Sequence, residues 1–302
     1  MLATENKKRC VLGTAGLGGV WGKVDPVESV DTILTALEAG INAIDTAPAY
    51  GDAEMYVGEA LRLWPGEKPQ LSTKVGRLKC YATDEGRYDY SHAGMQRSVE
   101  QSLETLGVSQ LDVLFLHDPD AINPAEVGRI IESLQTFKTK GYTRKIGVGG
   151  NPPLWLLPYL KPQIFDVLME FNKLNACSVV ALEENLPFCI NNKITYFAAS
   201  PLNMGLLGGN YETFTSNRPT WLHVKFVEAA IKMKNIAYRH GMALHTLAHR
   251  FLLSIPQSFC IVIGASNREQ LKDTLSDFDN GPLPNTLFLE IMNSLNKKEI
   301  HV

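Results

Sequence analysis

Short runs of apolar residues alternate along the whole chain with longer segments in which apolar residues recur every three or four positions. The short runs have the length and β-branched content of buried strands, and the longer segments have the spacing of helices with one buried face. We therefore predict strands at residues 11–13, 42–45, 70–74, 111–117, 145–149, 167–171, 195–199 and 259–263. Helices are predicted at residues 26–39, 53–63, 93–106, 124–139, 178–191, 224–253, 267–275 and 285–294, with a short one after Asn151.

The first predicted helix has clear signals at both ends. Asp25 precedes Pro26, which is the order of a helix N-cap followed by proline in the first turn, and Gly40 ends the apolar pattern. Strands that alternate with helices indicate parallel strands joined by crossover helices. Eight such units with almost continuously apolar strands favour a closed barrel. The predicted fold class is α/β, a (β/α)8 TIM barrel that forms a single domain over residues 1–302.

An open doubly wound sheet is the competing architecture, and it usually carries G-x-G-x-x-G after its first strand. Gly16 and Gly18 begin this pattern, but Trp21 stands at its last position. Gly147 and Gly149 begin a second copy, which ends on Pro152. Neither pattern is complete, so any dinucleotide is expected to bind in another way.

Composition and charge narrow the possible partners. Of the 302 residues, 45% are hydrophobic and 20% charged, as in an ordinary globular protein. A net charge of −3 provides no positive field for nucleic acid or an anionic membrane. The longest apolar stretch, residues 251–263, is interrupted by Pro256 and Gln257 and is unsuited to spanning a bilayer. We expect a small-molecule substrate, no nucleic acid and no membrane, and the sequence leaves the oligomeric state open.

Cysteine usage bears on the compartment. The chain has five cysteines and no C-x-x-C pair: Cys10, Cys80, Cys177, Cys189 and Cys260. An odd number without such spacing suits a reduced setting better than a disulfide framework. Residues 1–9 are polar and lack the apolar core of a signal peptide. We expect a cytoplasmic protein.

Four reactive side chains fall at or just after the carboxyl ends of consecutive predicted strands. Asp45, Lys74 and His117 end the second, third and fourth strands, and Tyr50 follows in the loop after Asp45. In a barrel of this kind, chemistry occurs at the carboxyl ends of the strands. Each residue alone could be structural, but all four in successive units are hard to explain by packing. We call these four residues the candidate tetrad.

The candidate tetrad suits proton transfer coupled to hydride transfer. Tyrosine has an ordinary pKa of about 10, and a nearby ammonium group lowers it by stabilising the phenolate. Asp45 would keep Lys74 charged and oriented, and His117 would hydrogen-bond to the substrate oxygen. Tyr50 would then be the general acid for carbonyl reduction or the base for alcohol oxidation.

Other readings of the reactive residues stay open. Lys74 could form a Schiff base, as in barrel aldolases. His245 and His249 share one helix face, but Thr246 stands where a zinc peptidase needs glutamate, so we expect no metal and ordinary packing on the barrel. Trp21 could line the substrate pocket together with Tyr50 and His117, or pack in a loop.

The sequence resembles the aldo-keto reductases over nearly its whole length. The shared segments, in the family's order, are LGTAGLGG (12–19), GINAIDTAPAYG (40–51), GEAL (58–61), STKVGR (72–77), SLETLGVSQLDVLFLHDPD (102–120), IGVGGN (146–151) and SPLNMGLLGG (200–209). KVGR, YDYSHAG (88–94) and HDPD are similar to the D-threo-aldose, L-fucose and L-galactose 1-dehydrogenase group, to which a pyridoxal 4-dehydrogenase is related.

The resemblance implies a nicotinamide cofactor, NAD or NADP, and assigns the candidate tetrad to catalysis. It implies cofactor contacts at Thr14, Asp45, Gly149, Gly150, Ser200, Pro201, Leu202, Gly205, Gly264, Ser266, Arg268, Gln270, Asp273 and Thr274. Many relatives have Ser-Asn where Gly149 and Gly150 stand, and Gln near Leu168, for which Glu170 or Asn172 could substitute. Ala199 stands where relatives often stack a tyrosine on the nicotinamide.

The cofactor segment at residues 262–275 favours NAD. NADP-preferring relatives use Lys or Arg where this chain has Gly264, Ser266 and Gln270, and Arg268 alone could compensate. The segment after Pro282 is short, which predicts an open pocket for a small polar molecule. The resemblance thus implies oxidation of an aldose at C1 to a lactone. The alternatives are a general aldehyde or ketone reductase, a pyridoxal dehydrogenase, or a non-enzymatic cofactor-sensing subunit.

Overall fold

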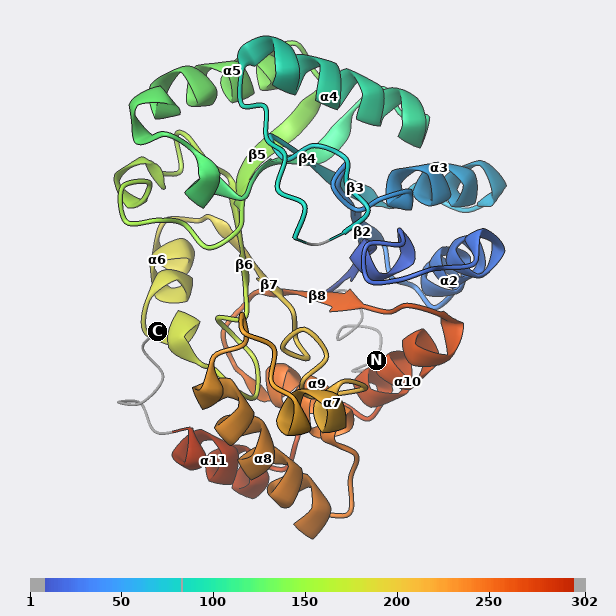
Figure 1. Cartoon of the computed structure of the whole chain (residues 1–302), viewed down its shortest axis with the longest axis vertical. Helices are drawn as coiled ribbons and strands as arrows, with labels where there is room; N and C mark the ends of the chain where they lie inside the picture. Colours follow the sequence, from blue (N-terminus) through green and yellow to red (C-terminus); the bar gives the residue numbers. More distant parts are fainter. Residues whose placement is uncertain (1–8, 83, 296–302) are drawn as a thin grey trace.

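The computed structural model describes residues 9–82 and 84–295, and in it eight parallel strands form a closed barrel (Figure 1). The strands are β1 (Cys10–Gly13), β2 (Ala43–Asp45), β3 (Gln70–Val75), β4 (Leu111–His117), β5 (Thr143–Gly149), β6 (Val167–Phe171), β7 (Thr195–Ala199) and β8 (Cys260–Gly264). Each strand pairs with the next along the chain, and β8 pairs with β1 to close the barrel. The predicted α/β barrel is therefore confirmed.

The helices lie outside the barrel (Figure 1). They are α2 (Pro26–Glu38), α3 (Ala53–Leu63), α4 (His92–Leu106), α5 (Val127–Thr139), α6 (Asn185–Asn191), α7 (Tyr211–Ser216), α8 (Val224–Arg239), α9 (Leu244–Ser254), α10 (Arg268–Asp279) and α11 (Asn285–Ser294). Asp25 caps α2 as predicted, because its side chain accepts a hydrogen bond from the Val27 amide. No helix in the described part of the chain is long and apolar enough to cross a membrane.

Two clusters of buried apolar residues stabilise the barrel. A large one lies between the strands and the surrounding helices, and a smaller one consists of Val11, Val113, Phe115, Val167, Met169 and Val262. The smaller set alternates along its strands with residues of the larger set, so it occupies the inner face of the barrel. This filled interior leaves the carboxyl ends of the strands as the open mouth.

Several predicted helices differ from the structure. The segment 124–139 begins with a 3-10 turn at Pro124–Glu126, and α10 continues to Asp279 beyond the predicted end at residue 275. The segment 224–253 is divided between α8 and α9, because Gly241 adopts φ +64° in the turn that separates them. The segment 178–191 begins with a 3-10 turn, and α6 starts only two residues before Pro187, which lacks the amide hydrogen that a helix interior needs. After Asn151 the chain forms a 3-10 turn at Leu157–Tyr159 instead of a helix.

Candidate active site

The mouth of the barrel brings a buried ion pair to the ends of β2 and β3. The Lys74 ammonium donates a hydrogen bond to Asp45 Oδ2 at 2.6 Å and another to the Thr46 carbonyl at 2.9 Å. Both side chains are almost completely buried. Removing one partner would leave an uncompensated buried charge, so each fixes the position and charge of the other.

The Asp45 carboxylate is held on its second oxygen as well. The Ser72 hydroxyl donates to Asp45 Oδ1 at 2.7 Å. The Thr14 amide and hydroxyl both donate to the Asp45 backbone carbonyl, at 3.0 and 3.1 Å. Asp45 is therefore an orienting group for Lys74, because its oxygens are already engaged.

Tyr50 lies directly beside the ion pair. The Lys74 nitrogen is 4.8 Å from the centre of the Tyr50 ring. Burial raises the pKa of Tyr50 above its ordinary value, and Lys74 opposes this effect without overcoming it. The predicted lowering of the Tyr50 pKa by Lys74 is present, but burial outweighs it, so the net shift is upwards. Burial by itself would lower the pKa of Lys74, but Asp45 and Tyr50 outweigh it and keep that pKa raised.

His117 completes the set with its ring edge-on to Tyr50. The ring centres are 5.8 Å apart and the planes meet at 88°. Burial, together with the charges of Lys74 and Arg77, holds the pKa of His117 well below its ordinary value, so the ring is neutral at physiological pH. Its Nδ1 atom is buried without a hydrogen-bond partner, whereas Nε2 lies 3.8 Å from Asp118 Oδ1. This arrangement favours the tautomer with the proton on Nε2, which is suited to donating to a substrate oxygen.

A charged pair stands beside His117 at the mouth. Arg77 Nη1 is 3.0 Å from Asp118 Oδ2, and Asp118 adopts a left-handed φ of 47°. The Tyr90 hydroxyl lies 2.8 Å from the carbonyl oxygens of both His117 and Asp118 and so fixes this backbone. Burial raises the pKa of Asp118, and Arg77 opposes that rise. Arg77 and Asp118 stand in the KVGR and HDPD motifs, but the sequence alone does not identify them as site residues.

A cavity of about 630 Å³ runs from Tyr50 across the mouth to the start of α10. It is lined by Trp21 and by the predicted cofactor positions Asp45, Ser200, Pro201, Leu202, Gly205, Gly264, Ser266, Gln270, Asp273 and Thr274. The volume lies within the usual range of about 300–1,000 Å³ for small-molecule sites. Asp45 and Tyr50 of the tetrad line this cavity together with Gln270 in the first turn of α10, and such a span suits a dinucleotide.

The loop after β7 lines much of this cavity. Ser200, Asn203 and Met204 adopt left-handed φ values of 59°, 49° and 56°. Such conformations are uncommon for residues other than glycine and are concentrated at functional sites. The side-chain amide of Asn203 is buried, and neither its nitrogen nor its oxygen has a hydrogen-bond partner among the described residues. A donor and an acceptor under this loop are therefore unsatisfied.

The remaining predicted contacts lie off the cavity lining. Gly149 and Gly150 are engaged in backbone hydrogen bonds, since the Gly149 carbonyl accepts from Asp118 and the Gly150 amide donates to Met169. Thr14 is completely buried behind Asp45. Met169, which sequence reasoning missed, lines the cavity in their place. Strand alternation could have identified it, because the inward positions of β6 are odd-numbered.

Glu170 faces away from the cavity, which corrects its proposed substitution for the missing glutamine. Its carboxylate accepts hydrogen bonds from Asn185 at 2.9 Å and from the Tyr196 hydroxyl at 2.8 Å. The residue is 2% exposed and belongs to the outer face of β6, like Leu168.

Arg268 is held by acidic residues of α2. Its guanidinium lies 2.9 Å from Glu28 Oε2 and 3.3 Å from Asp31 Oδ2. The Arg268 backbone amide also donates to Glu28, at 2.9 Å. The only cationic group predicted to reach a 2′-phosphate is thus already engaged by two carboxylates.

The paired histidines of α9 also line the cavity. His245 and His249 each place Nδ1 within 2.9 Å of Asp277 Oδ2, and Thr246 donates to the other oxygen at 2.6 Å. Sequence reasoning assigned this face to packing on the barrel and missed Asp277, whose position on α10 is 28 residues beyond His249. Asp277 thus engages Nδ1 of both rings.

Comparison with known proteins agrees with this geometry. A family model described as "Aldo/keto reductase family" matches residues 9–295. The chain is 29% identical to L-galactose dehydrogenase of Arabidopsis thaliana, covering 87% of this chain and 82% of the relative. It is 28% identical to NADH-specific methylglyoxal reductase of Escherichia coli, with 89% of each covered. Identity with D-threo-aldose 1-dehydrogenase of Pseudomonas sp is 26%, with 86% and 85% covered.

A solved structure agrees over the whole barrel. The glycerol dehydrogenase from Gluconobacter oxydans superposes with a TM-score of 0.76 at 25% sequence identity. The superposition covers 95% of this chain and 91% of that chain.

Proposed function

The chain belongs to the aldo/keto reductase family, and we propose that it oxidises a small sugar at C1 to a lactone, with NAD as the hydride acceptor. The coarser activity follows from the family: a nicotinamide-dependent oxidoreductase that acts on alcohol and carbonyl groups. The finer proposal concerns the substrate, the preferred cofactor and the role of each side chain.

The charged pair Arg77–Asp118 is the observation that most favours a polyhydroxylated substrate. Its carboxylate lies beside the His117 nitrogen that would contact the reacting oxygen. A hydroxyl on the carbon next to the reacting one could donate to Asp118, whose carboxylate is half-buried, and a hydrogen bond to a charged group is stronger than one between neutral groups. A hydrophobic aldehyde has no hydroxyl group that could hydrogen-bond to this pair. Two of the relatives reported above, L-galactose dehydrogenase and D-threo-aldose 1-dehydrogenase, carry sugar names.

The side chains of the tetrad would transfer the proton of the reacting hydroxyl group. When bound, the nicotinamide takes up the hydride released from C1 of the sugar. The proton of the C1 hydroxyl passes to Tyr50, whose phenolate form Lys74 stabilises. His117 holds the sugar oxygen through Nε2, and Asp45 keeps Lys74 in place. In the reverse direction Tyr50 returns the proton to the carbonyl oxygen.

The environment of Lys74 disfavours the aldolase alternative. A Schiff base needs a neutral amine to attack a carbonyl. The Asp45 carboxylate at 2.6 Å stabilises the ammonium and keeps the pKa of Lys74 raised. The same ion pair is what a proton-transfer role requires.

A panel of purified-enzyme assays tests the proposal. L-galactose, D-arabinose and L-fucose are offered with NAD and with NADP, methylglyoxal and benzaldehyde with each reduced cofactor, and nicotinamide absorbance is followed. We expect sugar oxidation with the highest kcat/KM for NAD. Reduction of aldehydes alone would overturn the sugar proposal and favour a reductase like the methylglyoxal enzyme of Escherichia coli. Tight cofactor binding without any turnover would favour a cofactor-sensing subunit.

A further inference from the structure

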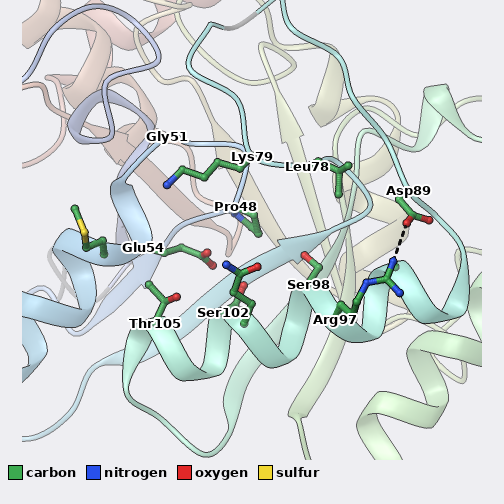
Figure 2. A pocket seen from close by; sticks show the side chains of 13 residues that line it. Pro48, Gly51, Glu54, Leu78, Lys79, Asp89, Arg97, Ser98, Ser102 and Thr105 are labelled. Atoms are coloured by element: carbon green, nitrogen blue, oxygen red, sulfur yellow. Dashed lines mark hydrogen bonds and ion pairs between the residues drawn. The ribbon is translucent and has the colours of Figure 1, made fainter.

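A second cavity lies outside the barrel, between α3 and α4 (Figure 2). Its volume is about 330 Å³, and it shares no lining residue with the cavity at the barrel mouth. Pro48, Met55 and Leu78 give it apolar surface, and Glu54, Ser98 and Ser102 give it polar surface. Nothing in the proposed oxidation uses this space.

Glu54 is a buried carboxyl that has no cationic partner within residues 9–82 and 84–295. It is 9% exposed, and its Oε1 accepts a hydrogen bond from the Thr73 hydroxyl at 2.6 Å. The cations that line the cavity are committed elsewhere: Lys79 is 2.7 Å from Asp52, and Arg97 is 3.4 Å from Asp89, a contact drawn in Figure 2. Among the described residues, no ion pair reaches Glu54.

The burial of Glu54 has an energetic consequence. Removal from water raises the pKa of this carboxyl, since the charged form loses its hydration. Buried carboxylates in proteins are ordinarily paired with a cation or a metal. An incoming cation would supply the partner that the chain does not.

Ser102 is a second buried polar group at this cavity whose hydrogen bonding is incomplete. It is 1% exposed, and it lines the cavity close to Glu54 (Figure 2). Its hydroxyl lies near enough to Glu54 to lower the pKa of that carboxyl, but within the described part of the chain it has no hydrogen-bond partner of normal geometry. Buried hydroxyls are almost always hydrogen-bonded, and exceptions call for an explanation. The hydroxyls of Ser98 and Thr105 line the same cavity.

We propose that this cavity binds a small organic molecule with a primary ammonium group, which pairs with Glu54 and donates to the Ser102 hydroxyl. A short methylene chain would lie against Pro48, Met55 and Leu78. The cavity is too large for a bare metal ion. Of the two carboxylates that line it, Asp89 is paired with Arg97, so Glu54 alone supplies too few ligands for a metal ion. A neutral polyol would leave the Glu54 charge without a partner, and an anion would be repelled by it.

Calorimetric titration of the full chain saturated with cofactor tests this site separately from the catalytic one. The probe is 4-amino-1-butanol, and 1,4-butanediol is the neutral comparator with the same number of heavy atoms. We expect the amine to bind about tenfold more tightly than the diol or better, which is the contribution of one charged hydrogen bond. Equal affinities, or no saturation by the amine at millimolar concentration, would overturn the proposal.

Variants locate the binding. Glu54→Gln keeps the shape and the contact with Thr73 but removes the charge, so the amine should bind about tenfold more weakly. Ser98→Leu retains Glu54 and fills the cavity, so it should abolish binding even if Glu54→Gln folds poorly. Glu104→Gln, on the exposed side of α4, is the matched control and should leave the affinity unchanged. Amine binding that persists in Ser98→Leu would place the molecule elsewhere and refute the assignment.

Discussion

At the scale of single residues, Tyr50 is placed between opposing influences. Burial favours the neutral phenol, while the Lys74 ammonium 4.8 Å from the ring favours the phenolate. Because burial is the larger effect, the resting protein holds a protonated Tyr50 at neutral pH. Such a group is ready to act as an acid towards a carbonyl, and it becomes an effective base only when the pH rises.

Removal of the Tyr50 hydroxyl should abolish the proton transfer while leaving the cavity intact. For Tyr50→Phe we expect kcat to fall by about 10²–10⁴-fold, which is the usual contribution of general acid–base catalysis. Cofactor affinity, measured by fluorescence quenching, should change little because the ring remains. Unchanged turnover would remove Tyr50 from its proposed role.

The raised pKa of Tyr50 predicts opposite pH profiles for the two directions. Oxidation needs the phenolate, so its rate should climb as the pH rises towards the tyrosine pKa. Reduction needs the phenol, so its rate should be flat at neutral pH and fall on the alkaline side. Because Lys74 lowers that pKa, Lys74→Met should shift both the rise in the oxidation rate and the fall in the reduction rate to higher pH. The control is Lys79→Met, which replaces an exposed lysine and should cause no such shift. Rates are measured in both directions by pH-jump assays. If oxidation and reduction show the same dependence on pH, the proposed role of Tyr50 is contradicted.

Asp118 should discriminate between substrates with and without neighbouring hydroxyls. Asp118→Asn keeps the shape of the side chain but loses the charge, so kcat/KM for an aldose should fall by about tenfold. Methylglyoxal, which carries no hydroxyl, should be affected much less. Asp120→Asn, exposed in the same loop, is the control. An equal loss for both substrates would show that Asp118 only supports the fold of the mouth.

The sequence predicts some of these residues and not others for a physical reason. Asp45, Lys74 and His117 each end a strand, so local pattern and barrel geometry are enough to bring them together. The partners of Arg77 and Arg268 are 41 and 240 positions away, and only the folded chain shows which acid each one meets. The direction of the Tyr50 pKa likewise depends on burial that the sequence does not display.

At the scale of elements, the contact between α2 and α10 bears on cofactor choice. Glu28 and Asp31 on α2 hold the Arg268 guanidinium at the first residue of α10. An arginine already paired with two carboxylates has little to offer a 2′-phosphate, and the carboxylates would repel that phosphate. This contact supports the proposed preference for NAD.

Neutralising those two acids should therefore improve the use of NADP. In the double variant Glu28→Gln, Asp31→Asn, we expect the ratio of kcat/KM for NADP to that for NAD to rise by about tenfold or more, since Arg268 becomes free to bind phosphate. Glu38→Gln, exposed at the end of the same helix, should leave the ratio unchanged. A ratio that stays constant in the double variant would show that Arg268 does not face the cofactor.

Element boundaries show where sequence patterns are sufficient. Strand positions follow from apolar runs and match the structure to within a residue or two at each end. Helix periodicity continues across Gly241, where a left-handed backbone separates α8 from α9. It also begins before Asn185, although Pro187 is tolerated only in the first turn of α6, so pattern alone starts that helix too early. The turn at Leu157–Tyr159 replaces a helix where Pro152, Pro153 and Pro158 crowd one segment.

At the scale of the whole molecule, closure of the barrel depends on how its interior is filled. β5 carries Gly147 opposite Phe115 of β4. A Cβ on Gly147 would lie 2.7 Å from the Phe115 ring and 2.7 Å from the Val167 backbone carbonyl on β6. The glycine is thus required by space, because β4 and β6 approach it from both sides.

Adding one methyl group at Gly147 should therefore destabilise the entire barrel. For Gly147→Ala we expect a loss of about 1–3 kcal/mol in the free energy of unfolding, the usual cost of overpacking a core, measured by denaturant titration. The matched control is Gly128→Ala on α5, where an added Cβ meets no atom within 4 Å and alanine favours the helix by up to about 1 kcal/mol. Since neighbouring strands share the strain, the Gly147 variant should also weaken cofactor binding at the mouth, whereas the Gly128 variant should not. Equal stability of the two variants would mean that the β4–β6 wall can spread without cost and that the packed interior does not set the strand spacing.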